Sequence, residues 1–236
     1  MIFNAGISKG LTLSAFIPYR HVLNEKVLFR GQNDNQYEGG LYSREADGLG
    51  DIILQMSYQI NLFKNHFPLL LGAGIKLANG KINAVDKYKS RISDNLQVGS
   101  GSVDPVLSIY TNESMGSFML SSGVFTRISS RENIYGYKYG NELHALMNLD
   151  YIGSDLFFGG LQLYYLLTTR DTYQYGKIAR DRGGKSIFFS TKMGTKITDD
   201  FDLELIIQLP VYQRLNESQL TSSYSIQFGT LYRFTL

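Results

Sequence analysis

Strict alternation of apolar and polar residues over long segments is the feature that most constrains the fold of this chain. In residues 201–211, apolar side chains occupy every second position, and Asp202, Glu204 and Gln208 lie between them. A period of two is typical of a β-strand, because successive side chains of a strand point to opposite faces of the sheet. The segment is about twice as long as an average strand of a soluble protein, and it matches the roughly 9 to 11 residues of a membrane-spanning strand.

The same alternation recurs along the chain and predicts eleven strands. Residues 141–150 also fit a helical spacing, with apolar side chains at Leu143, Leu146 and Met147, but a strand is favoured for consistency with its neighbours. The predicted strands are residues 3–7, 11–19, 52–60, 69–77, 105–111, 118–126, 143–151, 157–167, 187–197, 201–211 and 224–234.

The connections between these strands alternate in length. Short turns are predicted at residues 8–10, 64–66, 112–116, 152–155 and 198–200, and longer polar loops at 20–47, 79–101, 128–140, 169–185 and 213–221. Outer-membrane barrels have short periplasmic turns and long external loops. The pattern therefore predicts an all-β fold, a transmembrane antiparallel up-and-down β-barrel, in which residues 1–236 form a single domain.

The strand count also predicts a strand that this sequence does not contain. If the short turns are periplasmic, the first visible strand must start outside the cell. Bacterial single-chain barrels have an even number of strands, so about twelve are expected in the intact barrel. We therefore expect the chain to be truncated at its N-terminus, with the first strand and a signal peptide preceding Met1.

Composition narrows the functional classes. The 23 basic and 21 acidic side chains give a formal net charge of +2 without a basic block, so nucleic acid is not an expected partner. The absence of cysteine excludes disulfides, thiolate metal sites and a cysteine nucleophile. No apolar run approaches the roughly 18 residues that a membrane helix needs.

The faces opposite the apolar ones carry charges of both signs, and they are predicted to point into the barrel. Two interpretations remain open: a narrow polar-lined channel for a small solute, or a plugged lumen in which the charges pair with one another. Inward aromatic side chains would suit an aromatic or amphipathic solute, or they fill space. The candidate solute-binding residues are Arg20, Asp51, Gln55, Lys76, Asp104, Tyr110, Phe125, Arg127, Glu142, His144, Lys192, Glu204 and Arg233.

Catalytic and metal sites are not indicated. Among the three histidines, His144 is the best candidate for a general base, but no serine lies beside it in a nucleophile arrangement. Residues 33–40 offer oxygen ligands for calcium, although their spacing differs from an EF-hand and a solvated loop is favoured. The sequence predicts no catalytic residue, no metal and no cofactor.

Several short motifs follow one another in a familiar order. They are GLGDI at 48–52, KLANG at 76–80 and GSGSVDP at 99–105, together with IPY at 17–19 and LYRF at 231–234. In this arrangement the chain resembles the outer-membrane proteins grouped as "MetA-pathway of phenol degradation", over nearly its whole length. Asp51 and Asp104 match the acidic residues at strand starts in that family.

The resemblance implies a channel in the bacterial outer membrane that takes up a small hydrophobic, aromatic or amphipathic solute, without enzymatic activity. Its expected partners are outer-membrane lipid, the barrel-insertion machinery and the solute. The chain departs from the usual barrel ending, because Thr235 and Leu236 follow Phe234. The alternative function is a closed structural or assembly barrel whose external loops bind a partner.

Overall fold

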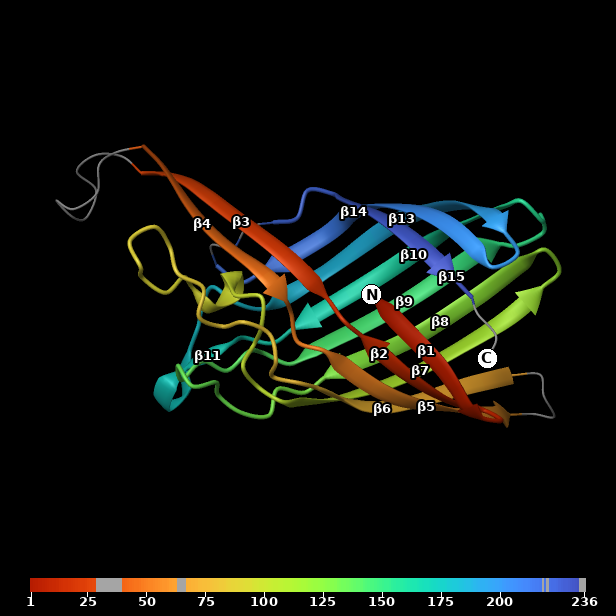
Figure 1. Ribbon diagram of the computed structural model, residues 1–236, viewed down its shortest axis with the longest axis horizontal. Helices are drawn as coiled ribbons and strands as arrows, with labels where there is room; N and C mark the ends of the chain where they lie inside the picture. Colours follow the sequence, from red (N-terminus) through yellow and green to blue (C-terminus); the bar gives the residue numbers. More distant parts are fainter. Residues whose placement is uncertain (29–39, 63–66, 218, 220, 234–236) are drawn as a thin grey trace.

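Eleven antiparallel strands form one long curved sheet in the computed structural model (Figure 1). The structure describes residues 1–28, 40–62, 67–217, 219 and 221–233. In sheet order the strands are β1 (Ile2–Ser8), β2 (Leu11–Phe16), β5 (Ile53–Leu62), β6 (Phe67–Lys76), β7 (Asp104–Met115), β8 (Phe118–Arg127), β9 (Glu142–Tyr151), β10 (Phe157–Thr168), β13 (Gly184–Thr198), β14 (Phe201–Leu215) and β15 (Ser225–Tyr232). Each of the eleven predicted strands is present, including β9, for which a helix was the alternative.

The alternation of the sequence becomes an alternation of burial. In β7, Val106 and Ser108 are 1% and 8% exposed, whereas their neighbours Leu107 and Ile109 are 48% and 41% exposed. Apolar side chains on the outer face and polar ones on the inner face reverse the usual order of a soluble protein, and this inversion is typical of a barrel in lipid.

The sheet is open, so the predicted closed barrel is only partly observed. Strand β1 pairs with β2, and β15 pairs with β14; within the described residues neither has a strand on its other side. The sheet nevertheless curls strongly, with β1, β2 and β15 in front of β7–β10 (Figure 1).

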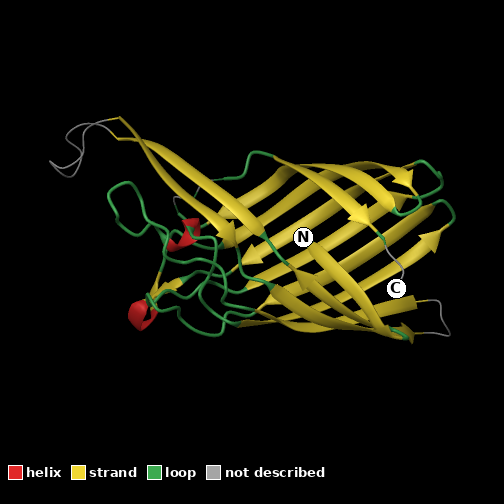
Figure 2. Ribbon diagram, viewed as in Figure 1, coloured by secondary structure: helices red, strands yellow, loops and turns green. Residues whose placement is uncertain are grey.

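The described connections place long loops at one end of the sheet and tight turns at the other, as predicted (Figure 2), whereas the predicted turn at residues 64–66 lies outside the described residues. We call these the loop end and the turn end. The loop end carries the 3-10 helices η1 (Asp94–Leu96) and η2 (Gln174–Gly176) and the short pair β11 (Thr172–Tyr173) and β12 (Lys177–Ile178). Among the described residues, no helix has the length and apolarity needed to span a bilayer.

One predicted loop was wrong. Within residues 20–47, strands β3 (Tyr19–Leu28) and β4 (Gly40–Leu49) form a separate antiparallel hairpin that projects from the loop end (Figure 1). Residues 29–39, which include Tyr37 and most of the candidate calcium segment, lie outside the described residues. The predicted strand 11–19 stops at Phe16, because Pro18 lacks a backbone N–H and disfavours a continuous ladder.

A small apolar core lies at the loop end, apart from the sheet. It consists of Ala46 on β4 together with Ala84, Ile92, Leu96 and Val98, all at most 8% exposed. These residues bring the connection between β6 and β7 under the β3–β4 hairpin. The long loops therefore form a packed cap over one end of the curved sheet.

Candidate functional site

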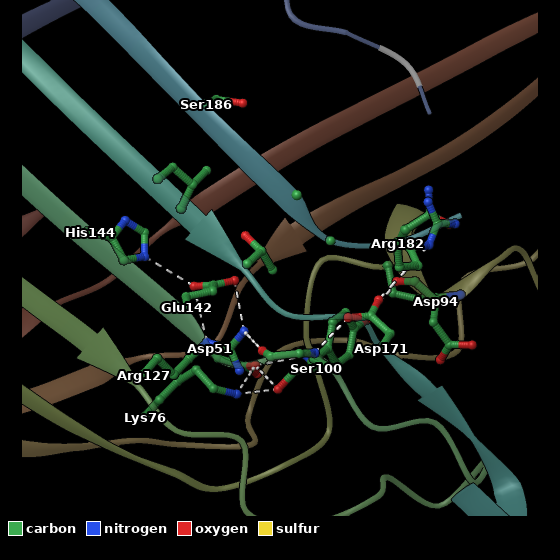
Figure 3. A pocket seen from close by; sticks show the side chains of 18 of the residues that line it. Asp51, Lys76, Asp94, Ser100, Arg127, Glu142, His144, Asp171, Arg182 and Ser186 are labelled. Atoms are coloured by element: carbon green, nitrogen blue, oxygen red, sulfur yellow. Dashed lines mark hydrogen bonds and ion pairs between the residues drawn. The ribbon is translucent and has the colours of Figure 1, made fainter. Parts of the chain in front are cut away.

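A chain of buried charges lines the inner wall at the loop end (Figure 3). Lys76 Nζ lies 3.0 Å from Asp51 Oδ2 and 3.0 Å from Asp104 Oδ2. The same Asp104 oxygen lies 2.9 Å from Arg127 Nη1, and Arg127 Nη2 lies 2.8 Å from Glu142 Oε1. Negative and positive groups thus alternate, so nearly every charge has an opposite neighbour.

Strand register accounts for this arrangement. Lys76 pairs with Asp104 across β6 and β7, and Arg127 pairs with Glu142 across β8 and β9. The Asp104 side chain is 0% exposed, and those of Lys76 and Arg127 are 8% exposed. A charge so far from water needs a partner, because the cost of burying it alone is several kcal/mol.

The loop between β6 and β7 holds Asp51 from the other side. One Asp51 oxygen accepts hydrogen bonds from the Ser100 backbone N–H at 2.8 Å and from its hydroxyl at 2.5 Å, and the other accepts the Gly80 N–H at 2.9 Å. A Cβ on Gly99 would lie 2.3 Å from the Gly80 carbonyl carbon, so glycine is required where these two loop segments meet.

An aromatic row lies beside the charges. The rings of Phe125 and His144 are 5.4 Å apart, those of His144 and Tyr164 5.9 Å, and those of Tyr164 and Phe188 5.9 Å. These residues come from the consecutive strands β8, β9, β10 and β13. His144 joins the two features, because Nδ1 lies 2.5 Å from the Tyr164 hydroxyl and Nε2 lies 3.3 Å from Glu142 Oε2.

A cavity of about 810 Å³ lies beside the charged chain and the aromatic row. Phe16, Phe125 and Phe188 line it, and so do Lys76, Arg127 and Glu142. Its walls come from strands on opposite sides of the curled sheet and from the capping loops. It therefore presents aromatic surface and compensated charge to the same space.

The capping loops add a second polar cluster beside the cavity. The Tyr137 hydroxyl donates a hydrogen bond to Asp171, which also accepts the Gly140 N–H at 2.6 Å. Burial raises the pKa of the Tyr137 phenol above its usual range, and the Asp171 carboxylate raises it further. Burial likewise raises the pKa of Tyr139, whose hydroxyl donates to the Asp94 carbonyl.

A second cavity of about 480 Å³ lies at the turn end. Lys192, Glu204 and Arg233 line it, and Arg233 is paired with Asp202. The Arg233 side chain is 49% exposed, more than any member of the loop-end charge chain, whereas that of Glu204 is 32% exposed, as is that of Glu142.

The structure divides the thirteen candidate residues into three groups. Eight lie in or directly beneath the loop-end cavity, and they are Arg20, Asp51, Lys76, Asp104, Phe125, Arg127, Glu142 and His144. Gln55, which bonds Ser108, and Tyr110 line neither cavity, whereas Lys192, Glu204 and Arg233 line the turn-end cavity. Tyr42 on β4 is only 8% exposed, and its hydroxyl donates a hydrogen bond to Asp86, so it does not face an approaching solute.

Several site residues were missed. Asp150 shares the inward phase of Glu142 and His144, so the alternation of β9 could have revealed it. Ser100, Tyr139 and Asp171 come from loops without periodicity, and the sequence carries no comparable signal for them.

The histidine does not complete a nucleophile arrangement with a serine. In the described part of the chain its hydrogen-bonding contacts are the Tyr164 hydroxyl and the Glu142 carboxylate. Among the described residues there is also no group of three or more acidic or histidine side chains that could hold a metal ion.

Comparison with known proteins identifies a solved structure with a similar fold. No family model matches the chain, and no curated protein matches it. The structure is similar to the crystal structure of an outer membrane channel from Pseudomonas putida F1, with a TM-score of 0.68 and 11% sequence identity over 98% of this chain and 79% of that one. The chain therefore shares its fold with an outer membrane channel of known structure.

Proposed function

We propose that this protein is a channel of the bacterial outer membrane that takes up a small hydrophobic, aromatic or amphipathic solute passively. The shared fold with an outer membrane channel supports this proposal, as does the apolar outer face of the sheet. The resemblance to the phenol-degradation outer-membrane proteins points in the same direction. On this proposal the partners are outer-membrane lipid, the barrel-insertion machinery and the solute.

Strand directions support a closed barrel of about twelve strands. All neighbours in the eleven-stranded sheet are antiparallel, so the edge strands β1 and β15 run in the same direction. One further strand between them would be antiparallel to both and would satisfy both edges. Unpaired strand edges are not tolerated in hydrocarbon, so closure of this kind is required for membrane insertion.

The loop-end cavity is the observation that carries the proposal. Its volume of about 810 Å³ falls within the range of small-molecule sites. The aromatic row can receive the apolar part of a solute, while the paired charges offer hydrogen bonds without a large net field. This combination favours an amphipathic solute over an ion.

Substitution of Phe188 tests this assignment. In vesicles or planar bilayers containing the full-length protein, the concentration of benzyl alcohol that half-saturates flux should rise about two- to ten-fold in Phe188→Ala, because an aromatic contact is lost. Phe189→Ala is the matched control, since Phe189 is the adjacent residue, does not line the cavity and is 37% exposed. Equal effects of the two substitutions would contradict the assigned cavity.

The alternative is a closed structural or assembly barrel, whose lumen an uninterrupted ion-pair network would fill. The observed pairs instead join Lys76, Asp104, Arg127 and Glu142 on consecutive strands, along one wall. They leave the cavity beside them free. Absence of both conductance and solute flux from correctly folded protein would nevertheless overturn the channel and favour this alternative.

A further inference from the structure

A row of uncharged polar side chains crosses the inner wall between the aromatic row and the turn-end charges. The pairing register places them side by side on consecutive strands, and they are Ser121, Asn148, Gln162, Ser190 and Gln208. Each strand contributes one amide or hydroxyl group. Such groups exchange hydrogen bonds with a solute without attracting either sign of charge.

The middle of this row faces a cavity of about 230 Å³. Asn148, Gln162 and Ser190 line it, and Ser190 is only 1% exposed. Among the described residues, the buried atoms Ser190 Oγ and Asn148 Oδ1 have no hydrogen-bond partner. Buried polar atoms rarely remain unsatisfied, so a hydrogen-bonding molecule in this cavity would supply partners that the described residues do not.

The charged groups around the cavity are already compensated. Lys192 Nζ lies 2.6 Å from Asp150 Oδ1 and 3.9 Å from Glu204 Oε2. Glycine between them permits the closer pair, because a Cβ on Gly160 would lie 2.2 Å from that Asp150 oxygen. Of the buried lining atoms without a hydrogen-bond partner in the described residues, Asp150 Oδ1 is already ion-paired with Lys192, so the neutral groups left to bind a solute are an acceptor on Asn148 and a donor-acceptor hydroxyl on Ser190.

We propose that this cavity is a second binding site, which takes the hydroxyl groups of a small neutral polyol. The inference rests on the proposed channel function and extends it to a neutral, hydrophilic class of solute. The cavity shares Asp150, Lys192 and Glu204 with the turn-end cavity, so the two cavities adjoin. Ile206 also lines this cavity and offers an apolar contact to the carbon skeleton.

Xylitol flux into vesicles containing the full-length protein tests the site. In Ser190→Ala and in Asn148→Leu, the concentration of xylitol that half-saturates flux should rise about two- to ten-fold, because each loses one hydrogen bond to the solute. Ser190→Ala removes a hydroxyl without a protein partner in the described residues, so folding should be unaffected. Ser121→Ala is the matched control: it lies in the same row but does not line the cavity.

The outcomes separate this inference from the channel itself. If benzyl alcohol passes but xylitol does not, or if xylitol flux is the same in all three variants, the polyol site is wrong and the cavity holds water only. If gluconate flux changes as much as xylitol flux, the variants alter the pore in general and the preference for neutral polyols is wrong. If no solute passes, the channel proposal fails, and this site with it.

Discussion

The two ends of the curved sheet handle charge differently. At the loop end, Asp104 is 0% exposed and contacts both Lys76 and Arg127, under a cap of loops with its own apolar core. At the turn end, the Asp202 carboxylate pairs with Arg233, whose side chain is 49% exposed. A shared buried carboxylate ties three strands together, whereas the turn-end pair joins β14 to the residue that follows β15 and leaves one partner in reach of water. Ion pairs of similar appearance therefore differ in what they contribute to stability.

Among the substitutions that test this contrast, Asp104→Asn should lower the free energy of unfolding most. The substitution keeps the shape of the side chain but leaves Lys76 and Arg127 with less compensation in a buried site. We expect the free energy of unfolding to fall by about 3 to 5 kcal/mol, as for other buried ion pairs that lose one partner. Urea unfolding of the protein in lipid vesicles, followed by tyrosine fluorescence, measures it.

Asp202→Asn is the matched change at the turn end. Because Arg233 is half-exposed, its guanidinium can return to water, and the loss should be about 1 kcal/mol or less. Similar losses from the two substitutions would show that burial does not distinguish the two ends.

After Asp104→Asn, the substitution Gly99→Ala should cause the next largest loss of stability. A Cβ there would meet Gly80 backbone atoms, so Gly99→Ala must push apart the two segments that hold Asp51. We expect a loss of about 1 to 3 kcal/mol, with faster hydrogen exchange confined to the loop end. Gly6→Ala is the control, since a Cβ on Gly6 would meet nothing within 4 Å. Unchanged exchange in the cap would argue against this close contact.

The smallest expected effect is a dependence of the stability of the cap on pH. Burial, followed by the Asp171 carboxylate, raises the pKa of Tyr137 above the usual value near 10, so the folded cap favours the protonated phenol. Its stabilisation is complete below about pH 10 and is lost as the pH rises through the higher folded-state pKa. Tyrosinate absorbance should show a late-titrating phenol that Tyr137→Phe removes. A titration that is complete near pH 10 would contradict the buried Tyr137–Asp171 contact.

The sequence predicts the sheet better than it predicts the site. All eleven strands could be found because lipid on one side and a polar lumen on the other impose a period of two. The β3–β4 hairpin was missed because it lies beyond the sheet and has polar residues on both faces. Asn24 and Arg44 bond each other at 2.5 Å on one face, and Glu25 and Ser43 bond each other at 3.3 Å on the other.

Contacts across strands depend on register, which a single strand does not reveal. The positions of Lys76, Asp104 and Arg127 on the inner face were predicted, but their common contact was not. The row that contains Asn148, Gln162 and Ser190 becomes visible only after four or more strands are aligned. The capping loops have no periodicity, so Ser100 and Asp171 could not be assigned to the cavity.

The β3–β4 hairpin has a consequence for the folding of the sheet. Apart from β2 and β5, all neighbouring strands of the sheet follow one another along the chain, with only the short pair β11 and β12 inserted between β10 and β13. Strand β2 must find β5 across residues 17–52, the longest separation between paired strands. Pairing of Tyr19 with Leu49 brings the two ends of this segment together before β5 docks, so the entropy of closing a long loop is replaced by that of closing a short one. The β3–β4 hairpin, although it lies outside the sheet, thereby keeps the contact order low, so the sheet can grow one hairpin at a time.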